Sequence, residues 1–260
     1  NPFDLLQNKY TLADDVFWNV GRHSLRFGGE AQRIGSDTFA PFQWGGAWTF
    51  NGLQSFLTNQ AASLSSALPG QENAFRKFRE WDFVGYVNDE WHTTARLTLN
   101  LGLRYAPTTN ATVDPGQQFL TPPFGGFSPV ERVFAKNPSL KNWDPRLGFA
   151  WDPFADHKTS VRGGFGVFHD IIQARVYSSA YYINPPFQLA TEPRPVFPTP
   201  FVTPRVGGIV SQGIDYATDT TPYAMQYNFN VQREIAAATV VTVGYVGAKG
   251  KNFFKQVDLN

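Results

Sequence analysis

The strongest pattern in the sequence is an alternation of apolar and polar residues with a period of two. In the segment 96–105, Leu97, Leu99, Leu101 and Leu103 occupy every second position, and Arg, Thr, Asn and Gly residues lie between them. Successive side chains of a β-strand point to opposite faces, whereas a helix would mix these positions. The pattern therefore predicts a strand that has one apolar face and one polar face.

The same alternation recurs along the chain, and the prolines gather outside it. Proline cannot donate a hydrogen bond to a β-ladder, so this separation distinguishes strands from loops. Eight strands are predicted, near 8–20, 23–33, 79–92, 96–105, 145–152, 159–168, 223–234 and 239–248.

The connections between these strands alternate between short and long. Turns of a few residues join the strands pairwise, whereas 34–78, 106–144 and 169–222 are long. Loops longer than about 12–15 residues are uncommon in compact domains. Short turns at one end and long loops at the other are typical of outer-membrane barrels. The predicted fold class is all-β, an antiparallel meander of about eight strands that forms part of a transmembrane β-barrel.

The composition is consistent with this fold and excludes several others. Charged residues make up 17% of the chain, the net charge is +1, and there is no cysteine. The near-neutral charge predicts no nucleic-acid partner, since phosphate binding needs clustered positive charge. The absence of cysteine excludes a disulfide scaffold and thiol chemistry. No apolar run approaches the roughly 18 residues of a membrane helix.

Aromatic residues at the ends of the strands favour lipid over water as the environment of the apolar face. Such residues form girdles where a membrane protein meets the two bilayer surfaces. They are Phe17, Trp18, Trp81, Trp91, Tyr105, Trp151 and Tyr245. A soluble β-sandwich, in which the apolar face would be the core, remains the alternative.

The long loops contain weaker signals. Residues 45–50 are predicted to form a short extra strand, and leucine and phenylalanine spacing in 52–68 predicts a short amphipathic helix. Segments 106–144 and 185–204 are rich in proline, glycine and phenylalanine, and are expected to be extended and irregular.

The sequence offers no arrangement typical of catalysis. The four histidines lack metal-binding spacing, and Gly163-Gly164-Phe165-Gly166 does not match a phosphate-binding loop. We expect no catalytic residues, no metal and no cofactor, and therefore no enzyme.

Candidate functional residues lie on the polar strand faces and in the loops. Polar side chains that would face a barrel lumen are expected to contact ligand or other parts of the protein, or simply to fill the lumen with hydrogen bonds. They are Arg26, Glu30, Gln32, Arg104, Arg146, Arg162, Gln226, Asn228 and Asn230. Aromatic residues that would stack on a ligand or pack their own loop are Trp44, Trp48, Tyr177, Tyr181 and Tyr182.

Several sequence blocks follow one another along the chain, namely Trp81–Trp91 with Leu97–Tyr105, Asn142–Pro153, Thr159–Phe168, Asn184–Phe187, Gln226–Glu234 and Val243–Gly250. Together these blocks resemble the Oar-like branch of the TonB-dependent outer-membrane receptors, whose members carry a carboxypeptidase-regulatory-like domain. Single blocks are modestly specific, whereas their order and spacing are highly specific. The resemblance covers nearly the whole chain except the interiors of the loops.

The resemblance implies a barrel of about 22 strands with a plugged lumen, in the bacterial outer membrane, energised through the TonB complex. We expect residues 1–260 to be a partial barrel without a plug domain, signal peptide or C-terminal barrel strand. The implied partners are membrane lipid, a plug domain, the remaining barrel, the TonB complex through the missing N-terminal part, and a small-molecule, peptide or glycan ligand of unknown identity.

The predicted function is ligand binding through extracellular loops and lumen for energised uptake. Two alternatives remain open from the residues alone. One is an autonomous eight-stranded outer-membrane adhesin or structural barrel, and the other is a soluble carbohydrate-binding β-sandwich.

Overall fold

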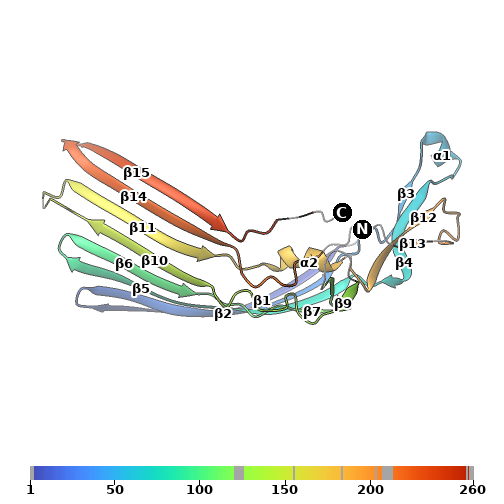
Figure 1. Ribbon diagram of the computed structural model, residues 1–260, viewed down its shortest axis with the longest axis horizontal. Helices are drawn as coiled ribbons and strands as arrows, with labels where there is room; N and C mark the ends of the chain where they lie inside the picture. The colour runs from blue at the N-terminus through green and yellow to red at the C-terminus, as the bar shows by residue number, and fades with distance from the viewer. Residues whose placement is uncertain are drawn as a thin grey trace.

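The computed structural model describes residues 3–119, 126–154, 156–182, 184–202, 204–206, 213–255 and 257. Its largest element is a curved antiparallel sheet in which strands that follow one another along the chain lie side by side (Figure 1). The strands of this meander are β1 (Asp4–Val20), β2 (His23–Phe39), β5 (Phe75–Thr94), β6 (Leu97–Tyr105), β10 (Trp143–Trp151), β11 (Thr159–His169), β14 (Tyr223–Ala236) and β15 (Thr239–Lys251).

The eight-strand meander confirms the fold class that the sequence predicts. The main differences lie at the loop ends, where β1, β2 and β5 extend further than expected. β2 continues to Phe39 and β5 begins at Phe75, and the two strands stay paired over this whole extension. The short turns gather at one end of the sheet, at the left of Figure 1. In the turn between β1 and β2, Gly21 has a φ of 59°, a left-handed conformation that glycine adopts at low cost.

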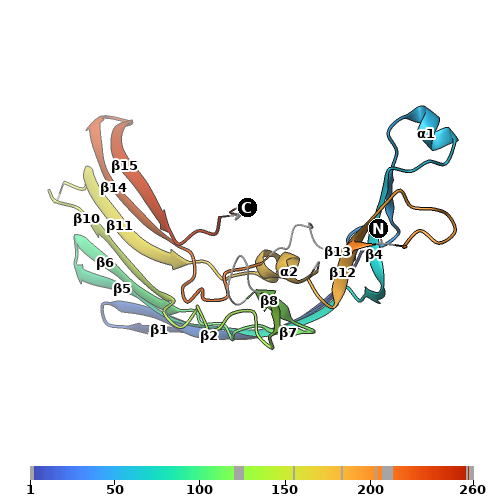
Figure 2. The ribbon, with the colours of Figure 1, turned by 45° about the vertical axis from the view of Figure 1, so that its right-hand side comes forward.

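The sheet is bent into a trough that has a concave and a convex side (Figure 2). Helix α2 (Ala174–Tyr182) lies on the concave side, where Tyr177 donates to Glu80 of β5. Because side chains alternate along a strand, the polar residues that share this face of β5, such as Asn88, are also on the concave side.

On the convex side Leu101 pairs with Leu147, and Phe165 follows in the same row. Leu101 is 39% exposed and Leu147 is 54% exposed. An apolar face this extended and this uncovered is typical of a surface that meets lipid or a partner rather than water.

One detail of the faces differs from the sequence expectation. Phe17 pairs with Arg26 and therefore lies on the concave side, whereas its neighbour Trp18 lies on the convex side. Asp89 lies on the convex side, close to the short turns. Its carboxylate is 2.7 Å from Nδ1 of His23, whose ring stacks on Trp91, so this acidic side chain has a local partner.

The long loops build a second layer beyond the outer end of the trough. A small sheet has the order β13-β12-β4-β3, formed by β13 (Arg205–Val206), β12 (Phe187–Pro193), β4 (Ser63–Glu72) and β3 (Ala47–Thr49). β7 (Thr112–Asp114) pairs with β5, and β8 (Gln117–Phe119) pairs with β9 (Phe127–Pro129).

The loop predictions are partly right. β3 matches the extra strand that was expected within 45–50. The helix expected over 52–68 is wrong in extent, because α1 covers only Leu53–Leu57 and Leu64 is buried in β4. Part of 185–204 is strand β12 rather than irregular chain. The pairing of β12 with β4 explains both errors, since it joins segments more than a hundred residues apart and leaves no local signal.

A hydrophobic core holds the loop layer against the extended part of β5. Phe78 of β5 packs in one cluster with Tyr177 and Tyr181 of α2 and with Val133 and Phe134 of the preceding loop. The ring centroids of Phe78 and Tyr177 are 5.4 Å apart. Among the described helices, none is long and apolar enough to span a membrane.

Arg76 ties β5 to the loop that leads into β12. Its side chain is fully buried, and its guanidinium donates to the carbonyl oxygens of Asn184 at 2.6 Å and Phe75 at 2.8 Å. Burial lowers the pKa of Arg76 to about 10. Carbonyl oxygens are the natural partners of a buried cation without a carboxylate, and they fix the Asn184–Phe187 block against the sheet.

If the convex face meets lipid, an arginine at its centre will prevent assembly. We expect Leu101→Arg to abolish or strongly reduce insertion into membranes, because an arginine at mid-bilayer costs about 2–4 kcal/mol. Insertion is measured by protease protection in liposomes. Asn100→Arg is the matched control, since it places the same side chain on the concave face of the same strand. Equal insertion of both variants would contradict the assignment of the faces.

Candidate functional site

The concave face brings together the polar side chains that the sequence singles out. Residues that lie opposite one another on neighbouring strands form a row across the sheet. One such row begins with Arg26, Asn88 and Gly102 and continues with Arg146, Gly166 and Gln226. All nine predicted lumen residues lie on this face, namely Arg26, Glu30, Gln32, Arg104, Arg146, Arg162, Gln226, Asn228 and Asn230.

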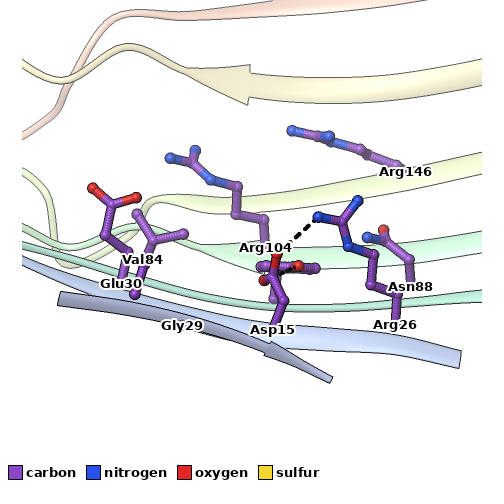
Figure 3. A pocket seen from close by; sticks show the side chains of 10 residues that line it. Asp15, Arg26, Gly29, Glu30, Val84, Asn88, Arg104 and Arg146 are labelled. Carbon is purple, nitrogen blue, oxygen red and sulfur yellow. Dashed lines mark hydrogen bonds and ion pairs between the residues drawn. The ribbon is translucent and has the colours of Figure 1, made fainter. Parts of the chain in front are cut away.

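Four of the nine line one cavity of about 390 Å³ on the concave face (Figure 3). These are Arg26, Glu30, Arg104 and Arg146. The remaining lining residues are Ala13, Asp15, Gly29, Val84, Tyr86 and Asn88. The walls come from β1, β2, β5, β6 and β10, so the cavity depends on the pairing of five strands.

Arg26 is held in place by an acidic and an aromatic neighbour. Its Nη2 lies 2.8 Å from Oδ2 of Asp15, and the hydroxyl of Tyr86 donates to the same carboxylate. The guanidinium also lies over the ring of Phe17, 4.9 Å from its centroid. Contacts on several sides orient this cation, which is therefore an ordered part of the cavity wall.

Asp144 connects three strands at the outer edge of the cavity. Its side chain is fully buried, and its Oδ2 accepts from Nη1 of Arg104 at 3.0 Å. Its Oδ1 accepts from the backbone N–H of His169 at 2.9 Å and lies 2.7 Å from Nδ1 of the same residue. Sequence reasoning missed Asp144 and His169, although the period of two places Asp144 on the same face as Arg146.

Two charged residues of the cavity, Arg146 and Glu30, form no ion pair within the described part of the chain. The guanidinium of Arg146 lies over the ring of Phe168, 4.9 Å from its centroid. The carboxylate of Glu30 accepts from the side-chain amide of Gln32 at 3.1 Å. The cavity therefore presents one free positive group and one free negative group to a solute.

The five loop aromatics are placed differently from one another. Trp44 is 46% exposed and Trp48 is 37% exposed, so both present rings to solvent. Tyr177 and Tyr181 are buried in the loop core, and Tyr182 packs against it. Stacking on a ligand is therefore open to Trp44 and Trp48, whereas the tyrosines of α2 pack the loop.

Glu80 lies beneath α2, one residue to the loop side of the girdle residue Trp81. The hydroxyl of Tyr177 donates to its carboxylate at 3.1 Å. Burial raises the pKa of Glu80 to about 7, the negative charge of Asp82 adds to this rise, and the hydrogen bond from Tyr177 opposes it. The helix thus packs on an acid that titrates near neutral pH.

Comparison with known proteins identifies the fold family. The sequence profile described as "Outer membrane beta barrel domain" matches residues 1–260. The chain belongs to this family of outer-membrane β-barrels. Its place is the bacterial outer membrane, so the convex face of the barrel sheet meets lipid and the concave face lines the lumen.

One solved structure matches this barrel domain at low similarity. It is the siderophore receptor PiuA of Acinetobacter baumannii, with 11% sequence identity and a TM-score of 0.40. The match covers 95% of the barrel domain described here and 39% of the PiuA chain, so the domain spans well under half of that receptor. No curated protein matches the sequence.

The polar side chains of the barrel wall are hydrogen-bonding groups. Within the described ranges, no group of three or more His, Cys, Asp or Glu side chains is arranged to hold a metal ion. The groups that face the lumen are guanidinium, carboxylate, amide and phenol, which donate and accept hydrogen bonds with a solute or with another part of the protein.

Removing the charge of Asp144 tests its connecting role. We expect Asp144→Asn to lower the free energy of unfolding by about 3 kcal/mol, because it leaves the guanidinium of Arg104 without its buried counterion. Urea unfolding in liposomes measures the change. Asp219→Asn, in an exposed loop, is the control and should change stability by less than about 0.5 kcal/mol. A stability loss no larger than that of the control would contradict the role of Asp144.

The raised pKa of Glu80 predicts a pH-dependent packing of α2. The packed state binds more protons than the unpacked state between the ordinary pKa of 4.5 and about 7. Packing is therefore strongest below pH 4.5 and weakens as the pH rises through 7. Hydrogen-exchange protection of α2, corrected for intrinsic rates, should be higher at pH 5 than at pH 8. Glu80→Gln should remove this difference; an unchanged difference in the variant would assign it to another group.

Proposed function

We propose that this barrel domain is part of a TonB-dependent receptor of the Oar-like kind. In this proposal the extracellular loops capture a ligand, the lumen binds it, and uptake is energised through the TonB complex, which a part of the protein outside this sequence would contact. The order and spacing of the sequence blocks support the assignment to this branch. The role is binding and transport, with no catalytic step.

The observation that carries the proposal is the open sheet. Among the described residues, β1 pairs only with β2, and β15 pairs only with β14. Backbone groups facing hydrocarbon must be hydrogen-bonded, so an open sheet edge does not persist within a membrane. The proposal supplies further strands to both edges, which would make the complete barrel wider than eight strands. A wide barrel has room in its lumen for a plug and a solute.

The same observation weighs against the two alternatives. An autonomous eight-stranded barrel needs β15 to pair with β1, and no such pairing joins the described parts of the two strands. A soluble sandwich needs a second sheet on the apolar face, yet Leu103, Leu147 and Val243 on that face are all exposed.

The loop layer supports the ligand-capture role. It forms at the outer end of the trough and is anchored by α2 on β5 and by Arg76 on the start of β12. Its outermost part is free of charge, because residues 38–71 contain no Asp, Glu, Lys, Arg or His. Exposed Trp44 and Trp48 lie within this stretch, which suits contact with uncharged groups of a ligand.

A cysteine reporter tests the proposal, because the chain has no native cysteine. We expect Asn228→Cys, in the lumen wall, to react with a membrane-impermeant maleimide added outside cells, and to react faster while the inner membrane is energised. Movement of a plug under TonB control would produce this difference. An uncoupler or loss of TonB should abolish it.

Phe229→Cys is the control, since it faces lipid on the same strand and should stay unlabelled in every condition. Labelling of the lumen cysteine at the same rate with and without energy would contradict the receptor function and favour a static barrel.

A further inference from the structure

Among the described residues, Glu30 and Arg146 are the charged groups of the lumen cavity that form no ion pair. The other two arginines are paired, Arg26 with Asp15 and Arg104 with Asp144. With those pairs counted, the cavity has no net charge but retains one carboxylate and one guanidinium. A purely anionic or purely cationic solute would meet one of these groups as a like charge. A solute that carries both charges would satisfy both groups.

Arg146 is exposed to the cavity because its neighbours in the row are glycines. Gly102 lies beside it on β6 and Gly166 beside it on β11. A Cβ atom added to Gly102 would lie 3.4 Å from Cβ of Arg146, and one added to Gly166 would lie 3.7 Å from its Cγ. The side chains of Asn88 and Phe168 take the space left open at these two glycines, and they flank the stem of Arg146. In Figure 3 the side chain projects into the cavity without an interaction to the other residues drawn.

The register fixes how far apart the two charges are. Glu30 is in the row of Val84 on β5. Arg146 is in the row of Asn88, which is four positions further along the same strand, and Gly102 of β6 lies between Asn88 and Arg146 in that row. Glu30 and Arg146 are thus three strands apart and four positions apart along the strands. Strand geometry converts this to about 14 Å across the sheet and about 13 Å along it, before the curvature draws the side chains together.

We propose that this cavity binds the two ends of a short zwitterionic peptide, with its carboxylate on Arg146 and its ammonium group on Glu30. A guanidinium matches a carboxylate in a bidentate manner, and a carboxylate accepts from an ammonium group. A single amino acid is too short to reach both groups. An extended peptide gains about 3.3 Å per residue, so three to five residues span the distance.

The wall between the two ends suits a peptide backbone. The row midway between the two ends carries the phenol of Tyr86 and the guanidinium of Arg104, which are hydrogen-bonding groups that a peptide backbone can use. The volume of about 390 Å³ lies within the range of small-ligand sites, roughly 300–1,000 Å³. The inference rests on the proposed function in one respect, since a solute has to be admitted to the lumen.

Calorimetric titration of the purified full-length protein in detergent with tetra-alanine tests the proposal. Three forms of the peptide are compared: free at both ends, N-acetylated, and C-amidated. We expect the wild-type protein to bind the free form, and each blocked form roughly three- to tenfold more weakly, because each block removes one charge-assisted contact.

The variants Arg146→Gln and Glu30→Gln identify which residue meets which end. Arg146→Gln should weaken binding of the free and acetylated peptides three- to tenfold and leave the amidated peptide unchanged. Glu30→Gln should weaken the free and amidated peptides and leave the acetylated peptide unchanged. This crossed pattern cannot arise from general misfolding, which would affect all three forms equally. Arg96→Gln and Glu90→Gln change the same charges outside the cavity and should bind as wild type.

Several outcomes would overturn the inference. They are absence of binding to the wild-type protein, equal affinity for free and blocked peptides, and equal losses for all three peptides in either variant. A lowered melting temperature of Arg146→Gln without any change in peptide binding would instead assign Arg146 to an acidic group of the protein itself. Peptide binding without energised labelling of the lumen cysteine would leave the cavity assignment standing and contradict only the receptor function.

Discussion

The requirement that every backbone N–H and C=O be hydrogen-bonded in a hydrocarbon environment determines most of this structure. It demands a continuous ladder through the membrane, which the meander from β1 to β15 supplies with each strand bonded to its chain neighbour. Because side chains in such a ladder point to only two faces, the sequence must alternate between apolar residues, which face lipid, and polar residues, which face the lumen. The convex leucine and aromatic rows and the concave polar rows follow directly from this.

The same constraint explains which parts were predictable from the sequence. Within the membrane, strand position depends on a period of two, and all eight strands and the faces of Leu101 and Arg146 could be predicted. Phe17 shows the limit, since an aromatic residue at a strand end is compatible with either face, and only the pairing with Arg26 decides it. Asp89 shows another limit of prediction from sequence. Its partner His23 is 66 residues away along the chain, so their contact leaves no local signal.

Outside the membrane the chain does not have to form a continuous hydrogen-bonded ladder, and the local sequence pattern no longer predicts the structure. The five-residue helix α1 and the strand β4 both arise from a segment whose leucine spacing indicated a single helix. What decides their structure is the burial of Leu64 and the pairing of β4 with β12, which are tertiary effects. The cavity could be predicted in part. Four of its five charged residues were predicted to lie on this face, but the ion pairs that neutralise two of these four and leave the other two unpaired depend on the geometry of the folded sheet.

The pairing of β4 with β12 also has a consequence for the order in which the protein forms. Each partner strand belongs to a different long loop, and four membrane strands separate the two in sequence. Closing a contact over such a distance is entropically costly in an unstructured chain, and contacts of this kind form slowly. Once β5 to β11 are paired, however, the ends of both loops are already close together. The loop layer is therefore built last, on a barrel wall that already exists, and a newly inserted barrel exposes separate loops before these loops pack together.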